Sequence, residues 1–261
     1  MEEEGATGCI YWNECCTAVG LAGFNLSDAT FEPDSLDPYL GNPAMAKATL
    51  SISSKNYSSW CLRGYLLCKL AGLEFDEEVV SLDDPGARAE LLLLSPSFLV
   101  PCLTDDGVKV WDTLAIAEYL AEAKPNAGLL PTDRAVRAHC RAICGEMHSG
   151  FYNLRSALPM NLKAHHPCYK VWAGAQADIE RVFAIWRECL AKYGGPYLFG
   201  KLSMADAMYA PVCSRFRTYD VKLDAPCTAY SRAIMSWPAM EEWIAAAREE
   251  PAELEELDVE F

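Results

Sequence analysis

Hydroxyl side chains gather where a predicted strand ends and a predicted helix begins, in the segment Ser54-Lys55-Asn56-Tyr57-Ser58-Ser59-Trp60. A hydroxyl at the N-terminus of a helix can donate a hydrogen bond to a thiolate, and it thereby favours the ionised form of the sulfur. The same hydroxyl can instead satisfy the free backbone N–H groups of the first helical turn. Ser58 and Ser59 are therefore candidates either for activating a thiol or for capping the helix.

A second polar pair, Asp112 and Thr113, follows Trp111 at the start of another predicted helix. Both residue types are good N-terminal residues, so plain capping explains them. A helix N-terminus with a free hydroxyl and a carboxylate can also hold the carboxylate and the ammonium group of one ligand together. The sequence leaves both interpretations open.

Pro101 opens a predicted hairpin strand directly after Val100. Only X-Pro bonds populate the cis form at modest cost, so this bond is a candidate cis peptide. Such a bond turns the backbone N–H and C=O of Val100 outward, where they can pair with an extended peptide as an added strand does. An ordinary trans proline at the start of an edge strand is the alternative.

Other residues of reactive types favour plain structural roles. The segment His165-His166-Pro167-Cys168 is compact and has no matching ligand set elsewhere, so no metal site is expected there. His148 fits a core or surface histidine better than a general base. Cys61, directly after Trp60, favours a small packing residue over a redox-sensitive thiol. The 12 cysteines include no Cys-x-x-Cys pair and favour free thiols in a reducing, cytosolic setting.

The predicted elements around these residues change character near residue 128. Alternation and helical spacing predict a strand over 49–53, a helix over 59–73 ended by Gly72, a strand over 77–82, a hairpin over 101–111 and a helix over 112–123. The later pattern predicts only helices, over 133–158, 170–193, 203–219, 227–236 and 238–249. We therefore expect a small α/β unit over 49–128 and an all-helical unit over 129–250.

Composition and charge exclude several classes of protein. The chain has 261 residues, of which 51% are apolar and 23% charged, so it is neither disordered nor of low complexity. No apolar run reaches the roughly 18 residues that a membrane helix needs, and the acidic start is unlike a signal peptide. We therefore expect no membrane contact.

The net charge of −15 is confined to the two ends of the chain. Residues 1–48 hold eight acids and one base, and residues 241–261 hold nine acids and one base, so the segment 49–240 is neutral. No stretch clusters lysine and arginine, so a nucleic-acid partner is not expected. We expect 1–48 to be a poorly ordered extension and 251–261 to be an acidic tail, both serving solubility or partner choice.

Taken in this order, these features resemble the cytosolic glutathione S-transferase family over roughly residues 49–248. The resemblance rests on the Val100-Pro101 strand opening, the Asp112-Thr113 helix start, the helical second half and the helix-start box Ser203-Met204-Ala205-Asp206. The stretches Lys55–Trp60 and 142–161 are similar to a bacterial-type subgroup near the zeta and omega classes. The fold class that this implies is α/β plus all-α, with a thioredoxin-like N-terminal domain followed by an all-helical glutathione transferase C-terminal domain.

The resemblance also implies roles for particular residues. Val100, next to a cis Pro101, would pair with the cysteinyl part of glutathione, and Asp112 and Thr113 would hold its γ-glutamyl end. Ser58 is the first candidate for the hydroxyl that stabilises the thiolate, and Ser59 is the second.

Two departures from the family pattern affect these roles. Alignment through Arg63 puts Asn56 where zeta-like relatives keep a catalytic serine and omega-like relatives a cysteine, so Asn56 is a third candidate and an omega-like thiol reductase is disfavoured. At Phe98-Leu99, where relatives often have a glycine and a basic residue, one contact to glutathione is expected to be lost.

The second substrate would lie between the two domains, against the first helix of the helical unit. Met147, Phe151 and Arg155 lie four residues apart and are predicted to share one face of that helix. Arg155 would favour anionic or carbonyl-bearing electrophiles, whereas Met147 and Phe151 fit a hydrophobic core equally well. Glutathione conjugation by a cytoplasmic homodimer is the expected function. Glutathione-dependent isomerisation or dehalogenation and a non-catalytic binding or scaffold role are the alternatives.

Overall fold

A computed structural model describes residues 48–80 and 100–250 of the chain. The predictions for the N-terminal extension, for the segment between the second strand and the hairpin (including Phe98-Leu99) and for the acidic tail lie outside the described residues. The boundary near residue 128 stays a prediction, because the described residues pack around one continuous hydrophobic core.

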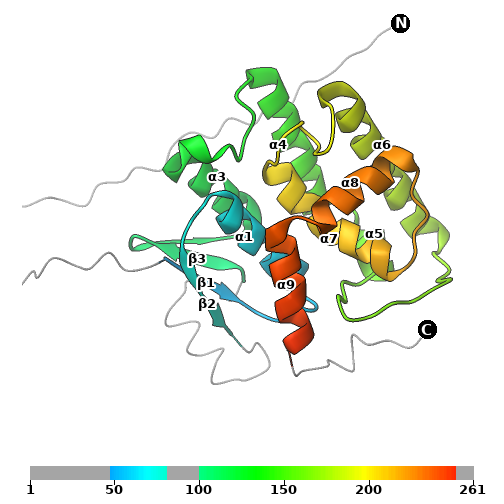
Figure 1. Cartoon of the computed structure of the whole chain (residues 1–261), viewed down its shortest axis with the longest axis horizontal. Helices are drawn as coiled ribbons and strands as arrows, with labels where there is room; N and C mark the ends of the chain where they lie inside the picture. The colour runs from blue at the N-terminus through cyan, green and yellow to red at the C-terminus, as the bar shows by residue number, and fades with distance from the viewer. Residues whose placement is uncertain (1–47, 81–99, 251–261) are drawn as a thin grey trace, which may run out of the picture. The chain divides into compact units, whose positions relative to one another are not determined.

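The first half of the described chain forms a four-stranded mixed sheet, in the order β2-β1-β3-β4 (Figure 1). Strand β1 (Ala48–Ile52) pairs in parallel with β2 (Phe75–Val79) and antiparallel with β3 (Cys102–Asp105), which forms the expected hairpin with β4 (Val108–Trp111). Strand β2 begins two residues before its predicted start because its pairing runs from Phe75 opposite Ala48 to Val79 opposite Ile52. The apolar side chains of β1 therefore lie in the core, whereas four of the five β2 residues are exposed.

Helix α1 (Ser59–Leu70) is the central helix of the described chain. It packs against α3 (Thr113–Ala123), α7 (Met204–Thr218) and α9 (Pro238–Glu249), and all but three of its residues are buried. Gly64 allows it to approach the sheet, because an added Cβ there would lie 2.7 Å from the Cβ of Pro101. This close contact places the middle of α1 against Pro101, at the strand opening.

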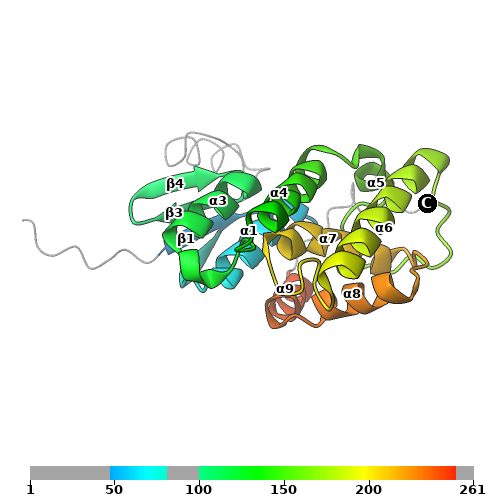
Figure 2. The same ribbon diagram turned by 90° about the horizontal axis from the view of Figure 1, so that it is seen from above.

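The second half of the described chain contains only helices (Figure 2). After the short turn η1 (Pro125–Ala127), these are α4 (Arg134–Ser149), α5 (Tyr152–Ala157), α6 (Ala173–Tyr193), α7, α8 (Ala225–Met235) and α9. Helix α8 begins two residues before its predicted start because Asp224 caps it and Pro226 lies in its first turn. Within the described residues, no helix combines the length and apolarity needed to cross a membrane.

The prediction of one continuous helix over 133–158 is wrong. Helix α4 ends where Gly150 donates its N–H to the carbonyl of Glu146, and a Cβ on Gly150 would lie 2.8 Å from that same oxygen. Phe151 then takes a left-handed conformation with φ of 59° before α5 begins. Gly150 is a typical helix-ending signal, and the apolar spacing on both sides of it concealed the break.

The predicted helix-start box at Ser203 is confirmed and lies in the core. The Asp206 carboxylate accepts hydrogen bonds from the N–H of Ser203 at 2.9 Å and from the N–H of Leu198 at 3.1 Å. Complete burial raises the pKa of Asp206 to about 6, although these hydrogen bonds lower it. The carboxylate therefore holds two buried segments of backbone together at the start of α7.

Asp206→Ala is expected to lower the free energy of unfolding by about 3 kcal/mol, because two buried N–H groups lose their acceptor. Urea unfolding at pH 7 measures this change. The matched control is Asp133→Ala, which removes the exposed N-cap of α4 and should cost about 1 kcal/mol. Equal losses in the two variants would contradict a buried role for Asp206.

Candidate functional site

The loop of residues 53–58, between β1 and α1, carries the candidate hydroxyls. Ser58 is the N-cap of α1, and its Oγ accepts a hydrogen bond from the N–H of Cys61 at 3.2 Å. The hydroxyl is half-buried, and its own proton can still be donated. The capping interpretation of Ser58 is therefore confirmed, and thiol activation by Ser58 stays a prediction.

Ser59, the first residue of α1, is buried beside a cation. Its Oγ accepts a hydrogen bond from Nη2 of Arg215, on α7, at 3.3 Å. A hydroxyl that accepts from a guanidinium is polarised to donate its own proton more strongly. Ser59 therefore has the better electrostatic environment of the two candidate serines.

Asn56 is fully buried and engaged in structural contacts. Its Nδ2 donates to Oδ1 of Asn161 at 3.0 Å, and its Oδ1 accepts from the N–H groups of Leu162 at 2.7 Å and Lys163 at 3.1 Å. The side chain thus links the loop 53–58 to the segment that follows α5. The sequence alone gave no sign of these contacts, because the partners lie more than 100 positions away along the chain.

The Val100–Pro101 peptide bond is cis, and Asp112 is the N-cap of α3. Oδ1 of Asp112 accepts hydrogen bonds from the N–H groups of Leu114 at 2.8 Å and Ala115 at 3.3 Å, so the predicted cap is confirmed. Its Oδ2 lies 2.5 Å from Nε2 of His148 on α4. His148 therefore pairs with the predicted ligand-binding carboxylate, a contact that the sequence did not indicate.

Thr113 has a fully buried side chain, and its hydroxyl has no hydrogen-bond partner within the described residues. A buried hydroxyl without a partner carries a desolvation cost that a ligand can relieve. Its place beside Asp112 at the N-terminus of α3 fits the carboxylate of an amino-acid ligand. Binding of a γ-glutamyl end by Asp112 and Thr113 stays a prediction.

Three arginines, Arg63, Arg155 and Arg215, surround the first turn of α1. The guanidinium carbons of Arg63 and Arg155 lie 4.7 Å and 4.9 Å from the centre of the Trp60 ring. None of the three forms an ion pair with a carboxylate of the described residues. Two donors, Nη1 of Arg63 and Nε of Arg155, are buried without a partner there. We call this group the arginine cluster.

The existing contacts of the arginine cluster go to neutral groups. Nε of Arg63 donates to the carbonyl of Met208 at 2.9 Å, and Nη2 of Arg155 donates to the carbonyl of His148 at 3.0 Å. Arg215 donates to the carbonyl of Leu158. These bonds position the guanidinium groups without supplying a negative charge from the part of the chain that the structure describes.

The pKa values of the arginine cluster are lowered as a result. Burial lowers the pKa of Arg63 well below its ordinary value, and the charges of Arg155 and Arg215 lower it further. Burial, followed by the charge of Arg155, lowers the pKa of Arg215 to about 10, and burial lowers that of Arg155. Buried cations that repel one another without a counter-ion favour binding of an anion.

The three residues predicted to line a substrate face do not share one helix. Met147 and Phe151 are buried in the core, on α4 and in the break after it, whereas Arg155 lies half-buried on α5. The reason is the helix break at Gly150 described above. Arg155 nevertheless lies against the Trp60 ring, in the first turn of α1.

The remaining reactive residues lie in structural environments. Burial raises the pKa of the Cys61 thiol, which lies 3.3 Å from the N–H of Ser53. His165 pairs with Asp220 at 2.9 Å, and His166 stacks on Tyr219. Among residues 48–80 and 100–250, no three His, Cys, Asp or Glu side chains gather as a metal site, and all nine cysteines are free thiols.

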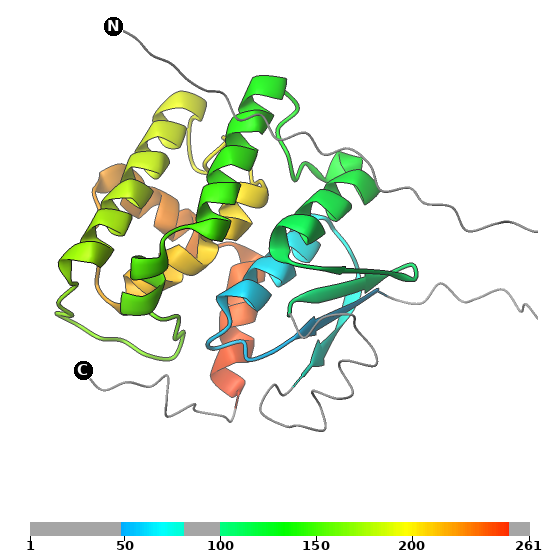
Figure 3. The same ribbon diagram turned by 180° about the vertical axis from the view of Figure 1, so that it is seen from behind.

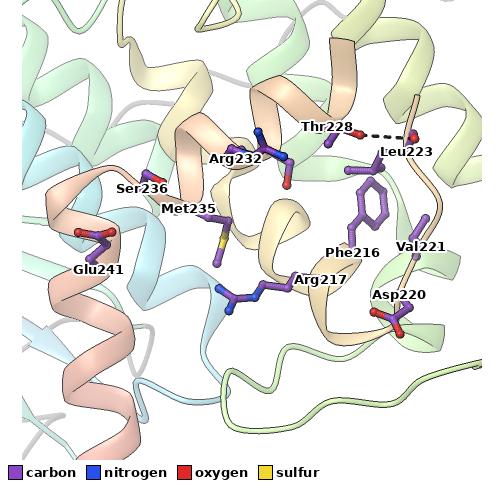
Figure 4. A pocket seen from close by; sticks show the side chains of 11 residues that line it. Phe216, Arg217, Asp220, Val221, Leu223, Thr228, Arg232, Met235, Ser236 and Glu241 are labelled. Atoms are coloured by element: carbon purple, nitrogen blue, oxygen red, sulfur yellow. Dashed lines mark hydrogen bonds between the residues drawn. The ribbon is translucent and has the colours of Figure 1, made fainter. Parts of the chain in front are cut away.

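A separate cavity of about 550 Å³ lies between the C-terminal end of α7 and the helices α8 and α9 (Figure 4). Arg217, Arg232 and the apolar side chains of Phe216 and Met235 are among the residues that line it. None of the site residues predicted from the sequence lines this cavity.

The fold defines the class of this protein, which has a thioredoxin-like domain followed by an all-helical domain. The features that define it are the four-stranded sheet, the cis proline at the strand opening, the serine that caps α1 and the helices that follow. The sequence matches the family model "Glutathione S-transferase, N-terminal domain" over residues 57–123 and "Glutathione S-transferase, C-terminal domain" over residues 169–246. Maleylacetoacetate isomerase of Rattus norvegicus is 31% identical over 169 residues, which are 63% of this chain and 76% of the rat protein. The chain therefore belongs to the glutathione S-transferase family.

Solved structures show the same fold. A bacterial zeta-class glutathione S-transferase, maleyl pyruvate isomerase, superposes with a TM-score of 0.60 at 23% identity, over 78% of this chain and all of the other. A Burkholderia glutathione transferase homologue with bound glutathione gives 0.58, also at 23% identity, over 77% and 98%. The expected position near the zeta and omega classes is confirmed.

The sequence did not lead us to expect Arg63 and Arg215 in the arginine cluster. Arg63 was used only to align the loop before it with the family pattern. Its position among apolar residues of a helix could have indicated a buried charge. Arg215 on α7 carried the same signal, because it lies next to the apolar residues Val212, Cys213 and Phe216. A charged residue on a helix that is buried all round requires a partner, and this requirement points to a site.

Asn56→Ala is expected to lower the free energy of unfolding by about 3 kcal/mol, because it removes hydrogen bonds to three buried or half-buried groups. Urea unfolding measures the change. Ser58→Ala, which removes only a helix cap in the same loop, is the matched control and should cost about 1 kcal/mol. A loss below that of the control would contradict a structural role for the Asn56 side chain.

Proposed function

We propose that this chain is a glutathione-dependent enzyme that acts on a small anionic electrophile. The observation that carries the proposal is the arginine cluster, whose buried charges have no carboxylate partner within the described residues and lie beside Ser59 and Trp60. A family that binds glutathione at this end of α1 would place the second substrate close to the cluster. An anionic substrate would compensate the charge.

Glutathione fits the residues at the start of α3. The unpartnered Thr113 hydroxyl would donate to the γ-glutamyl carboxylate, and the Asp112 carboxylate would hold the ammonium group. His148 already occupies one oxygen of Asp112, so the ammonium group would share that carboxylate with an imidazole. Val100, next to the cis bond, would pair its backbone with the cysteinyl part.

Glutathione supplies a thiol, which becomes a nucleophile when it ionises. Ser58 and Ser59 would each donate a hydrogen bond to the sulfur, and the Arg215 charge behind Ser59 would favour the ionised form. Asn56 is the weakest of the three candidates, because its amide already bonds Asn161 and the segment after it.

The electrophile would bring a carboxylate to Arg155, the half-buried member of the cluster. Two reaction outcomes are compatible with this arrangement. If the sulfur stays bonded to carbon, the product is a conjugate; if the bond breaks after rotation about a former double bond, the product is an isomer. The names of relatives, maleylacetoacetate isomerase and maleyl pyruvate isomerase, support the second outcome, because both denote cis-unsaturated acids.

The family relationship supports the remaining parts of the proposal. Cytoplasmic location, assembly as a homodimer and a role in detoxification are typical of glutathione transferases and are proposed here for this chain. A non-catalytic glutathione-binding protein is the alternative. It would be retained on immobilised glutathione and would turn over no electrophile.

Arg155→Met tests the anionic substrate directly. With a carboxylate-bearing α,β-unsaturated ketone, kcat/KM should fall roughly ten- to hundredfold, the equivalent of one charge-assisted hydrogen bond. With the methyl ester of the same compound, it should change less than about threefold. Steady-state kinetics of both substrates give the comparison.

The matched control is Arg187→Met, which removes an exposed guanidinium on α6 that pairs with Asp224. It should leave both substrates unaffected. The same loss for acid and ester in Arg155→Met would remove the basis for an anionic substrate.

A further inference from the structure

The carboxylate of Glu250, at the end of α9, binds the loop that carries the candidate hydroxyls. Its Oε1 accepts from the N–H of Lys55 at 2.6 Å, and its Oε2 accepts from the N–H of Asn56 at 3.0 Å and from Oγ of Ser54 at 2.9 Å. Glu250 is nearly 200 positions away from this loop along the chain. Figure 3 shows α9 beside the segment between β1 and α1.

Further contacts keep Glu250 and the loop in place. Lys163 donates its Nζ to the carbonyl of Glu250 at 2.5 Å, and Nε1 of Trp243 on α9 donates to the carbonyl of Lys55 at 2.9 Å. The Lys55 ammonium lies 5.4 Å from the centre of the Trp243 ring and pairs with Glu77 at 2.5 Å. Glu250 is therefore part of a fixed contact between α9 and the loop.

Ser54 transmits this contact to the turn that follows it. While its hydroxyl donates to Glu250, the same oxygen accepts from the N–H groups of Asn56 at 3.1 Å and Tyr57 at 3.3 Å. The carbonyl of Ser54 accepts from the N–H of Ser58 at 3.1 Å. The orientation of Ser54 thus determines where the backbone of Ser58 lies.

The three donors require a carboxylate at this position. Both carboxylate oxygens accept hydrogen bonds from the loop, and an amide in the same place would point its NH₂ at one of the donors. Hydrogen bonds to an ionised acceptor are also shorter and stronger than neutral ones. Glutamine would therefore be the same size as Glu250 but would bind the loop less well.

We propose that Glu250 is a positioning residue for the thiol-activating hydroxyls, and that it acts through Ser54 and the backbone of the loop 53–58. This inference rests on the proposed function, because it assumes that these hydroxyls face the sulfur of glutathione. The residues proposed to hold the rest of glutathione, Asp112 and Thr113, lie on α3. Loss of Glu250 therefore affects turnover more than it affects glutathione binding.

Glu250→Gln is the test, with steady-state kinetics at a saturating concentration of electrophile. The expected result is a fall in kcat of roughly ten- to hundredfold, the size of effect that a misplacement near 1 Å produces, with KM for glutathione within about twofold of wild type. Glu249→Gln is the matched control, because Glu249 is exposed and has no hydrogen bond within the described residues. It should behave as wild type.

Ser54→Ala provides a second variant, which leaves the Glu250 carboxylate in place. It should lower kcat in the same direction, and the double variant should be no slower than the slower single variant, because both changes break one connection. A wild-type kcat in Ser54→Ala and in folded Glu250→Gln would overturn the inference, and so would losses that multiply in the double variant.

Amide hydrogen exchange separates failure of this inference from failure of the proposed function. Glu250→Gln should speed exchange at Lys55 and Asn56 while exchange in the core of α7 stays unchanged. If the wild-type chain shows no glutathione-dependent turnover, the proposed function is wrong. Faster exchange in Glu250→Gln would then still show that Glu250 holds the loop in place. If the wild-type chain turns over substrate, and Glu250→Gln changes neither kcat nor the exchange rates, the inference about Glu250 is wrong while the proposed function stands.

Discussion

Burial of α1 is the constraint on which the rest of the structure depends. This helix lies between the sheet and the helical half of the chain, so each polar group on it must find a partner inside the protein. Ser59 finds one in Arg215, and Arg63 bonds the carbonyl of Met208. These contacts bring three guanidinium groups to the first turn of one helix, where no carboxylate of residues 48–80 or 100–250 pairs with them. The proposed anion-binding site follows from the way in which the helix is buried.

The helical half of the chain also shapes the site on the α/β half. Asn56 bonds the segment after α5, Glu250 bonds the loop 53–58 from α9, and His148 on α4 pairs with Asp112. Each contact joins a residue near the proposed glutathione site to a part of the helical half that lies many positions away along the chain. The two halves therefore determine the geometry together, and a change in a distant helix is expected to reach the thiol.

Local sequence patterns predicted most helices and strands of this fold, but they did not predict the contacts between residues that are far apart in the sequence. The hairpin around Asp106-Gly107, the cap at Asp112 and the box at Ser203 each depend on residues a few positions apart, so the sequence indicates them directly. The helix break at Gly150 was missed because apolar residues continue at helical spacing across it. The arginine cluster joins residues from α1, α5 and α7, and no spacing rule on one element can reveal such a group.

The central claim is that the arginine cluster binds a carboxylate-bearing molecule. The most direct measurement is the thermal unfolding midpoint of the wild-type chain with maleate, compared with neutral maleamide at equal ionic strength. A dianion present at a hundred times its Kd should stabilise the fold by about 2.7 kcal/mol, which corresponds to a rise of roughly 5–10 °C for a protein of this size. The same midpoint in maleate and maleamide would contradict the claim.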